Sequence, residues 1–223
     1  MTSVIAFDVN ETLLDLRALD EPFAQVLGDA ALRPQWFALM LQVSFVGGVT
    51  GDYVDFSTAQ RAAFTMLAER QGVEIGPDDA GKMVDRMSAL PAYPEVAAAL
   101  EQLRDTPLQV VALTNSVLEV AEAQLTAAGI RGLFDKVMSA DQVRRLKPAP
   151  EPYAAVAEAC SSTFGEVRLV AAHWWDITGA LSAGCKAAFV ARPGAVLSPA
   201  APRPDIVEPT LDAVVRRIVE TDL

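Results

Sequence analysis

The 223-residue sequence is poor in several residue types, and each shortage excludes a class of protein. Two cysteines, Cys160 and Cys185, are too few for a disulfide framework. Lysine and arginine number 18 against 29 acidic residues, and the net charge of −11 leaves no basic surface for nucleic acid. No apolar run reaches the roughly 18 residues that cross a bilayer, and the N-terminus lacks the features of an export signal. We therefore expect a cytoplasmic globular protein that binds neither nucleic acid nor membranes.

Hydrophobic residues make up 52% of the chain, and many of them stand in short uninterrupted runs. Short continuous runs are typical of strands that are covered on both faces, as in parallel sheets. Helical patterns separate the runs, which indicates a Rossmann-like, doubly wound α/β fold. Ligands of such folds bind beyond the carboxyl ends of the strands. The five runs cover residues 4–8, 110–115, 134–138, 167–172 and 187–191.

The segment between the first two predicted strands has no strand pattern. A stretch of this length is too long for a loop. We expect an inserted helical cap at residues 15–92, within a core made of residues 1–14 and 93–223. Its helical patterns cover residues 19–27, 33–45, 56–71 and 77–87. The glycines at 47, 48 and 51 predict a flexible or tightly turned joint between two helices, and residues 192–204 predict an irregular surface loop.

Four polar groups follow the predicted strands and meet at one edge of the sheet. Asp8 ends an apolar strand, where a carboxylate costs free energy unless it is hydrogen-bonded or used; alone, it is equally consistent with a turn or helix cap. Lys147 is followed by prolines that restrict the backbone, and Asp176 follows two tryptophans. His173 is the only histidine, and its near-neutral pKa suits a proton carrier. Residues 114–116 either cap the next helix or bind an oxyanion.

These residues carry a resemblance. The segments Asp-Val-Asn-Glu-Thr-Leu, Leu-Thr-Asn-Ser, Lys-Pro-x-Pro-x-x-Tyr and Trp-Trp-Asp resemble, in this order, the four motifs of the haloacid dehalogenase superfamily. The resemblance covers essentially the whole chain and is strongest to the type II L-2-haloacid dehalogenases. Phosphatases of the superfamily carry further acids at the positions of Asn10 and Ala172. With two fewer carboxylates, a tight Mg²⁺ site is not expected, and we predict neither a metal nor another cofactor.

The resemblance implies a two-step hydrolysis of a small carboxylate substrate. Asp8 would displace a leaving group from the α-carbon and form an ester, which water would then hydrolyse. Lys147 would neutralise charge near Asp8, Tyr153 would hydrogen-bond Asp8, and Asp176 would orient Lys147 or help to activate water. Relatives are often dimers, so a homodimer is expected by analogy. The other predicted site residues are the catalytic Thr12 and the substrate contacts Asn10, Leu41, Phe56, Thr114, Asn115 and Trp175.

Three positions depart from the family pattern. Phe37 stands where the family's cap arginine faces the leaving halide, and we expect no arginine near Phe37, since the closest one, Arg33, precedes it in the chain. Asn10 replaces an aromatic residue, and Ala171 and His173 replace a serine and an asparagine. We predict that His173 assists ester hydrolysis or protonates a leaving group poorer than halide.

The leading prediction is an (S)-2-haloacid dehalogenase that inverts the configuration at the α-carbon. One alternative is a hydrolase of the same fold that cleaves a C–N or C–O bond at that carbon, and another is a small-molecule phosphatase. A third is a non-catalytic binding protein that retains the pocket. The joint presence of Asp8, Lys147 and Asp176 speaks against this last alternative.

Overall fold

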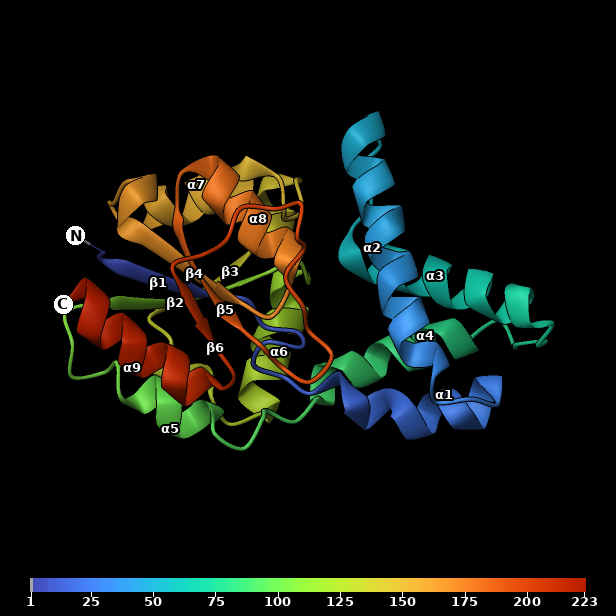
Figure 1. The fold of residues 1–223 in the computed structure, drawn as a ribbon. Helices are drawn as coiled ribbons and strands as arrows, with labels where there is room; N and C mark the ends of the chain where they lie inside the picture. The colour runs from blue at the N-terminus through green and yellow to red at the C-terminus, as the bar shows by residue number, and fades with distance from the viewer. Residues whose placement is uncertain (1) are drawn as a thin grey trace.

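A computed structural model describes residues 2–223 and contains one six-stranded, fully parallel sheet (Figure 1). The strand order is β3-β2-β1-β4-β5-β6, so the chain builds outward from β1 on one side and then returns to build on the other. This order confirms the predicted α/β fold. The strands are β1 (Val4–Phe7), β2 (Gln109–Thr114), β3 (Lys136–Ser139), β4 (Val167–Ala171), β5 (Lys186–Val190) and β6 (Ile206–Glu208). Strand β6 was not predicted, because three residues at a sheet edge are too short to show a pattern.

Different helices cover the two faces of the sheet. Successive side chains of β1 point to opposite faces, and their packing partners show which helices cover which face. Val4 and Ala6 belong to a core cluster with α7 and α8, whereas Ile5 and Phe7 belong to the cluster with α5, α6 and α9. Burial on both faces explains why the strands read as continuous apolar runs. These helices are α5 (Val96–Glu101), α6 (Leu118–Ala127), α7 (Pro150–Ala159), α8 (Trp174–Ala183) and α9 (Leu211–Asp222).

The segment after β1 is helical, as predicted, and lies beyond the end of the sheet at which β1 finishes (Figure 1). It contains α1 (Asp20–Leu27), α2 (Leu32–Thr50), α3 (Phe56–Gln71) and α4 (Asp79–Asp85). The domain limits at residues 15 and 92 stay a prediction. Within the described part of the chain, no helix is both long and apolar enough to cross a membrane.

The glycine-rich end of α2 differs from the expected joint. Gly47 and Gly48 lie inside the helix, which ends only at Gly51 with a left-handed φ of 84°. A Cβ at Gly47 would lie 2.7 Å from the carbonyl oxygen of Asp52. The glycine at 47 is therefore needed for the close return of the chain over α2, and not for a turn.

A buried ion-pair network anchors the C-terminal helix to the sheet. Arg168 of β4 is fully buried and donates to both carboxylate oxygens of Asp222 in α9, at 2.6 and 3.0 Å. It also donates to both oxygens of Asp205, at 2.6 and 2.9 Å. The network runs from the buried Arg168–Asp222 pair to the exposed Asp205, and its contacts do not involve the strand ends at which the candidate site is built.

Candidate active site

Asp8 follows the central strand β1 directly and is 4% exposed. Its backbone N–H donates to Val170 O at 3.0 Å, which continues the pairing with β4. One carboxylate oxygen accepts from Lys147 Nζ at 2.9 Å, and the other accepts from Thr12 Oγ1 at 2.6 Å. Thr12 accepts in turn from the backbone N–H of Ala172 at 2.9 Å, so its hydroxyl is fixed. The structure thus brings the predicted residues Asp8, Thr12 and Lys147 together.

Lys147 joins two carboxylates in the interior. Its Nζ also donates to Asp176 Oδ2 at 2.7 Å and to the backbone oxygen of Leu113 at 2.8 Å. Tyr153 donates to Asp176 Oδ1 at 2.6 Å, and the bond to Asp8 that the resemblance implied is absent from its contacts. A Cβ at Gly179 would lie 2.6 Å from Tyr153 Oη, so only glycine allows α8 to approach this closely.

His173 bridges Asp8 and a residue that the sequence reasoning did not identify, Glu11. Its Nδ1 lies 3.0 Å from Asp8 Oδ2 and its Nε2 lies 3.1 Å from Glu11 Oε2. Glu11 adopts a left-handed φ of 60°, a strained conformation for a residue with a side chain, which turns it toward the histidine. The imidazole stacks on Phe37 at 5.3 Å and on Trp175 at 5.0 Å between ring centroids.

A protonated His173 places a second cation beside Asp8, in addition to Lys147. Burial lowers the pKa of His173, but hydrogen bonds and attraction to Asp8 and Glu11 outweigh it and raise the pKa to about 9. Burial raises the pKa of Asp8, but the Lys147 charge and the hydrogen bonds from His173 and Thr12 hold it well below its usual range. Burial also lowers the pKa of Lys147, and Asp176 and Asp8 together raise it above its usual value. At neutral pH, Asp8 is therefore an ionised carboxylate between two cations.

A cavity of about 480 Å³ lies between α2 and the segments that follow β4 and β5. Phe37 and Leu41 line it from α2, and His173 and Trp175 line it from the core, as predicted for Leu41 and Trp175. Phe56, the other predicted apolar contact, is buried in the core cluster and is not among the lining residues.

Two arginines that the sequence reasoning did not place here also line this cavity. Arg33 lies one helical turn before Phe37 and pairs with Glu11 at 3.2 Å and Asp20 at 2.6 Å. The expectation that no arginine is near Phe37 is therefore wrong in space, because residues four apart share one helix face. Arg192 donates to the backbone oxygen of Thr12 and pairs with Glu95. Nothing in the proline-rich sequence around Arg192 marks this contact.

The side chains of Asn10, Thr114 and Asn115 are engaged within the protein. Asn10 donates to Ser116 Oγ and accepts from Gln124. Thr114 Oγ1 accepts from the backbone N–H of Ser116. Asn115 Oδ1 accepts from the backbone N–H of Lys147 at 2.8 Å, and Asn115 Nδ2 donates to the backbone oxygen of Lys147 at 3.1 Å. Asn115 therefore positions the lysine. Substrate contact by these three residues stays a prediction.

The donor atoms around Asp8 do not resemble a metal site. In the described part of the chain, no three or more His, Cys, Asp or Glu side chains are grouped to hold a metal ion. Lys147 Nζ and His173 Nδ1 occupy the positions next to the Asp8 oxygens, where a cation would bind. Asn10 offers its amide to Ser116, and Ala172 offers no side-chain ligand. These residues do not fit a magnesium ion, so no step below uses one.

The family model of haloacid dehalogenase-like hydrolases matches residues 2–184, and the chain belongs to this family. It is 26% identical to haloacetate dehalogenase H-2 of Moraxella sp. (strain B) over 216 residues, 96% of each chain. It is 29% identical to (S)-2-haloacid dehalogenase of Xanthobacter autotrophicus over 194 residues, 86% of this chain and 76% of that one. The structure of L-2-haloacid dehalogenase from Xanthobacter autotrophicus with chloropropionic acid covalently bound superposes with a TM-score of 0.93, at 26% identity and full coverage of both chains.

Proposed function

We propose that this protein is an (S)-2-haloacid dehalogenase, a hydrolase that converts a small 2-halogenated carboxylic acid to the 2-hydroxy acid and halide. The observation that carries the proposal is the state of Asp8, an ionised carboxylate at the end of the central strand. Lys147, Thr12 and His173 orient it. The relatives named above support the choice of a carbon–halide bond.

In the first step, an oxygen of Asp8 attacks the α-carbon from the side opposite the halogen. A C–O bond forms, the carbon–halogen bond breaks with its electron pair on the halide, and the configuration inverts. The His173 imidazolium and the edges of Phe37 and Trp175 face the cavity and can stabilise the departing anion. Asp8 is now a neutral ester.

In the second step, water attacks the carbonyl carbon of the ester and releases the 2-hydroxy acid. Esterification removes the negative charge that raises the pKa of His173 most directly, while Glu11 remains in contact. The pKa of His173 therefore falls, its proton passes to solvent, and the imidazole accepts a proton from the attacking water. The acyl–oxygen bond of the ester then breaks, the departing alkoxide takes that proton to give the 2-hydroxy acid, and the regenerated Asp8 carboxyl group returns a proton to His173. The histidine would act as a cation in the first step and as a base in the second.

Single turnover in ¹⁸O-labelled water, with enzyme in excess over (S)-2-chloropropionate, tests the ester route. We expect one ¹⁸O atom in the peptide that contains Asp8, and lactate whose hydroxyl oxygen is unlabelled because it comes from the aspartate. Label in the lactate with none in the peptide would mean that water attacks the substrate directly. The Asp8→Asn variant serves as the control for adventitious exchange.

One rival keeps the nucleophile and cleaves a C–N or C–O bond at the α-carbon. The protonated His173 beside Asp8 favours it, because an acid can protonate a leaving group poorer than halide. Assaying 2-amino and 2-alkoxy acids beside the 2-halo acids separates the two. The other rival is a small-molecule phosphatase. Phosphatase activity that EDTA abolishes and Mg²⁺ restores would favour this rival.

We propose further that the protein works in the cytoplasm on a free small carboxylate, with no nucleic-acid or membrane partner. The two free cysteines, Cys160 and Cys185, support a reducing compartment. Cell fractionation tests the location. A homodimer, proposed by family analogy, is tested by sedimentation velocity.

A further inference from the structure

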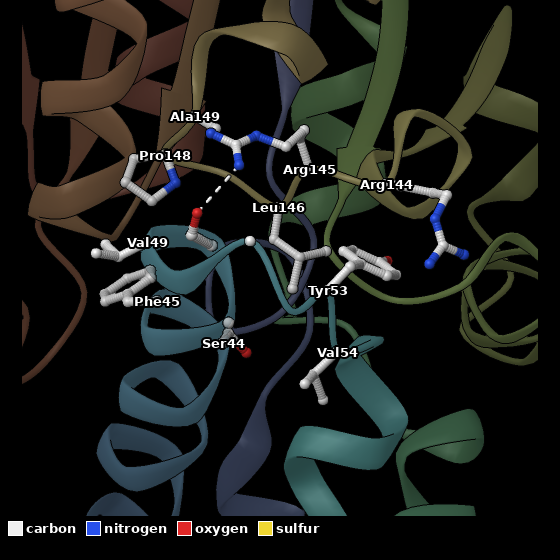
Figure 2. Close-up of a pocket in the computed structure, with 13 residues that line it drawn as sticks. Ser44, Phe45, Val49, Tyr53, Val54, Arg144, Arg145, Leu146, Pro148 and Ala149 are labelled. Atoms are coloured by element: carbon white, nitrogen blue, oxygen red, sulfur yellow. Dashed lines mark hydrogen bonds between the residues drawn. The ribbon is translucent and has the colours of Figure 1, made fainter.

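A second cavity of about 340 Å³ lies between the end of α2 and the loop that carries Lys147 (Figure 2). This is the size range of small-molecule sites. We call it the α2–loop cavity. Figure 2 shows Phe45 and Val49 of α2 on one side, Leu146 and Pro148 of the loop opposite, and Tyr53 and Val54 beside them. The other lining residues are Ser44, Gly47, Gly48, Gly51, Arg144, Arg145 and Ala149.

The α2–loop cavity adjoins the reaction centre. Leu146 and Pro148 flank Lys147, whose ammonium group contacts Asp8. Phe45 lines this cavity and Trp175 lines the other one, and their rings meet edge to face at 5.7 Å. The two aromatic rings are therefore a partition between this cavity and the site that contains His173.

Ser44 and Tyr53 at the α2–loop cavity already have hydrogen-bond partners, whereas the two arginines are only partly engaged, and Arg145 Nε has no hydrogen-bond partner. Ser44 donates to the backbone oxygen of Met40 at 2.9 Å, and Tyr53 donates to Asp141. Arg145 donates to the backbone oxygen of Gly48 at 3.0 Å, and the dashed line in Figure 2 marks this bond. Arg145 also lies 3.2 Å from Glu151, and Arg144 stacks over the Tyr53 ring at 4.7 Å.

Apart from the two guanidinium groups, the side chains that line the α2–loop cavity offer a ligand mainly hydrocarbon surface. Phe45, Val49, Val54, Leu146 and Pro148 line the α2–loop cavity with side-chain carbons. A hydrogen-bonding group placed against these five side chains would lose its water without finding a partner among them. An anionic group could pair only with the guanidinium groups of Arg144 and Arg145. An alkyl chain makes no hydrogen bonds to water that it could lose, and burial of its apolar surface would favour binding.

We propose that the α2–loop cavity is the subsite for the alkyl substituent of longer 2-substituted carboxylic acids, and that Phe45 controls access to it. The inference rests on the proposed function and adds to it the chain length of the substrate. The carboxylate and α-carbon stay at Asp8, and the substituent passes the Phe45 ring into the cavity. Each methylene buried there is worth about a fourfold gain in affinity.

Two valines on α2 provide a matched test. Val49 lines the α2–loop cavity and is 89% exposed, whereas Val46 lies three residues earlier, is 55% exposed and does not line it. Phenylalanine at either position is tolerated by the fold, because both side chains reach solvent. The measured quantity is the ratio of kcat/KM for (S)-2-bromohexanoate to that for (S)-2-bromopropionate.

We expect V49F to lower this ratio about fivefold or more, V46F to leave it unchanged, and Phe45→Ala to raise it. Equal ratios in V49F, V46F and the unmodified protein would overturn the subsite. Calorimetric titration with hexanoate, which has no leaving group, gives a second arm: V49F should weaken binding and V46F should not. If the unmodified protein hydrolyses no 2-halo acid, the proposed function fails, and this binding arm alone decides the subsite.

Discussion

Replacing His173 with asparagine, the residue that the family has at this position, removes the cation of the site that loses its charge as the pH rises through about 9. In the folded protein the pKa of His173 is about 9, against an ordinary value of 6.5. That difference of about 2.5, at 1.36 kcal/mol for each unit of pKa, corresponds to about 3 kcal/mol. Because the pKa is raised in the folded state, this stabilisation is fully present below pH 6.5 and is lost as the pH rises through 9.

The assay is urea denaturation of the natural protein and of H173N at pH 6 and pH 10. Asparagine cannot titrate, so the natural protein should lose about 3 kcal/mol more of its free energy of unfolding than H173N over this interval. The comparison with H173N cancels the titration of other groups. An equal loss in both proteins would refute the contact of a charged His173 with Asp8 and Glu11.

Four further substitutions separate the site from the scaffold. Lys147→Met leaves two buried carboxylates without their cation, so we expect a loss of about 3–5 kcal/mol in urea denaturation and of at least about a thousandfold in kcat. Gly179→Ala forces a methyl group against the Tyr153 hydroxyl and should cost about 1–3 kcal/mol and lower kcat. Gly165→Ala is the control, because nothing lies within 4 Å of the added carbon, and it should change neither the free energy of unfolding nor kcat. Arg168→Met should lower the melting temperature while leaving kcat of the folded protein unchanged, and a loss of kcat would show that this network reaches the site.

Periodicity and the strand-end residues made most of the fold and the centre of the site predictable. The runs at β1, β2 and β4 are continuous because helices cover both faces of the sheet, and Asp8 follows one of them. Contacts made by long side chains across the fold could not be predicted. Glu11 reaches His173 only through a left-handed backbone turn, and Arg192 arrives from a loop about 180 residues away from the backbone oxygen it binds. Of the glycines predicted to form a joint, Gly51 ends α2 in a left-handed conformation, whereas Gly47 and Gly48 lie inside the helix. The close approach of the Asp52 carbonyl to Gly47 leaves no recognisable sequence pattern.

The most consequential difference between this chain and the family pattern is the source of positive charge near the leaving group. A cap arginine carries a fixed charge, since its pKa lies above 12. Here the corresponding helix position presents Phe37, whose ring stacks on His173, and the nearby Arg33 is paired with Glu11 and Asp20. The cation that both lines the cavity and contacts Asp8 is therefore the imidazolium, which Asp8 and Glu11 hold in place.

An imidazolium can lose its proton, and it loses it more easily once Asp8 is esterified. The halide-releasing step should therefore slow as the pH rises through about 9, while hydrolysis of the ester should not. Rapid-quench measurements at pH 7 and pH 10 would resolve the two steps, since slower halide release lowers the burst rate and leaves the later phase in place. In H173N the burst rate should lose this dependence on pH. A burst rate that is independent of pH in the natural protein would mean that the cationic form of His173 takes no part in halide departure.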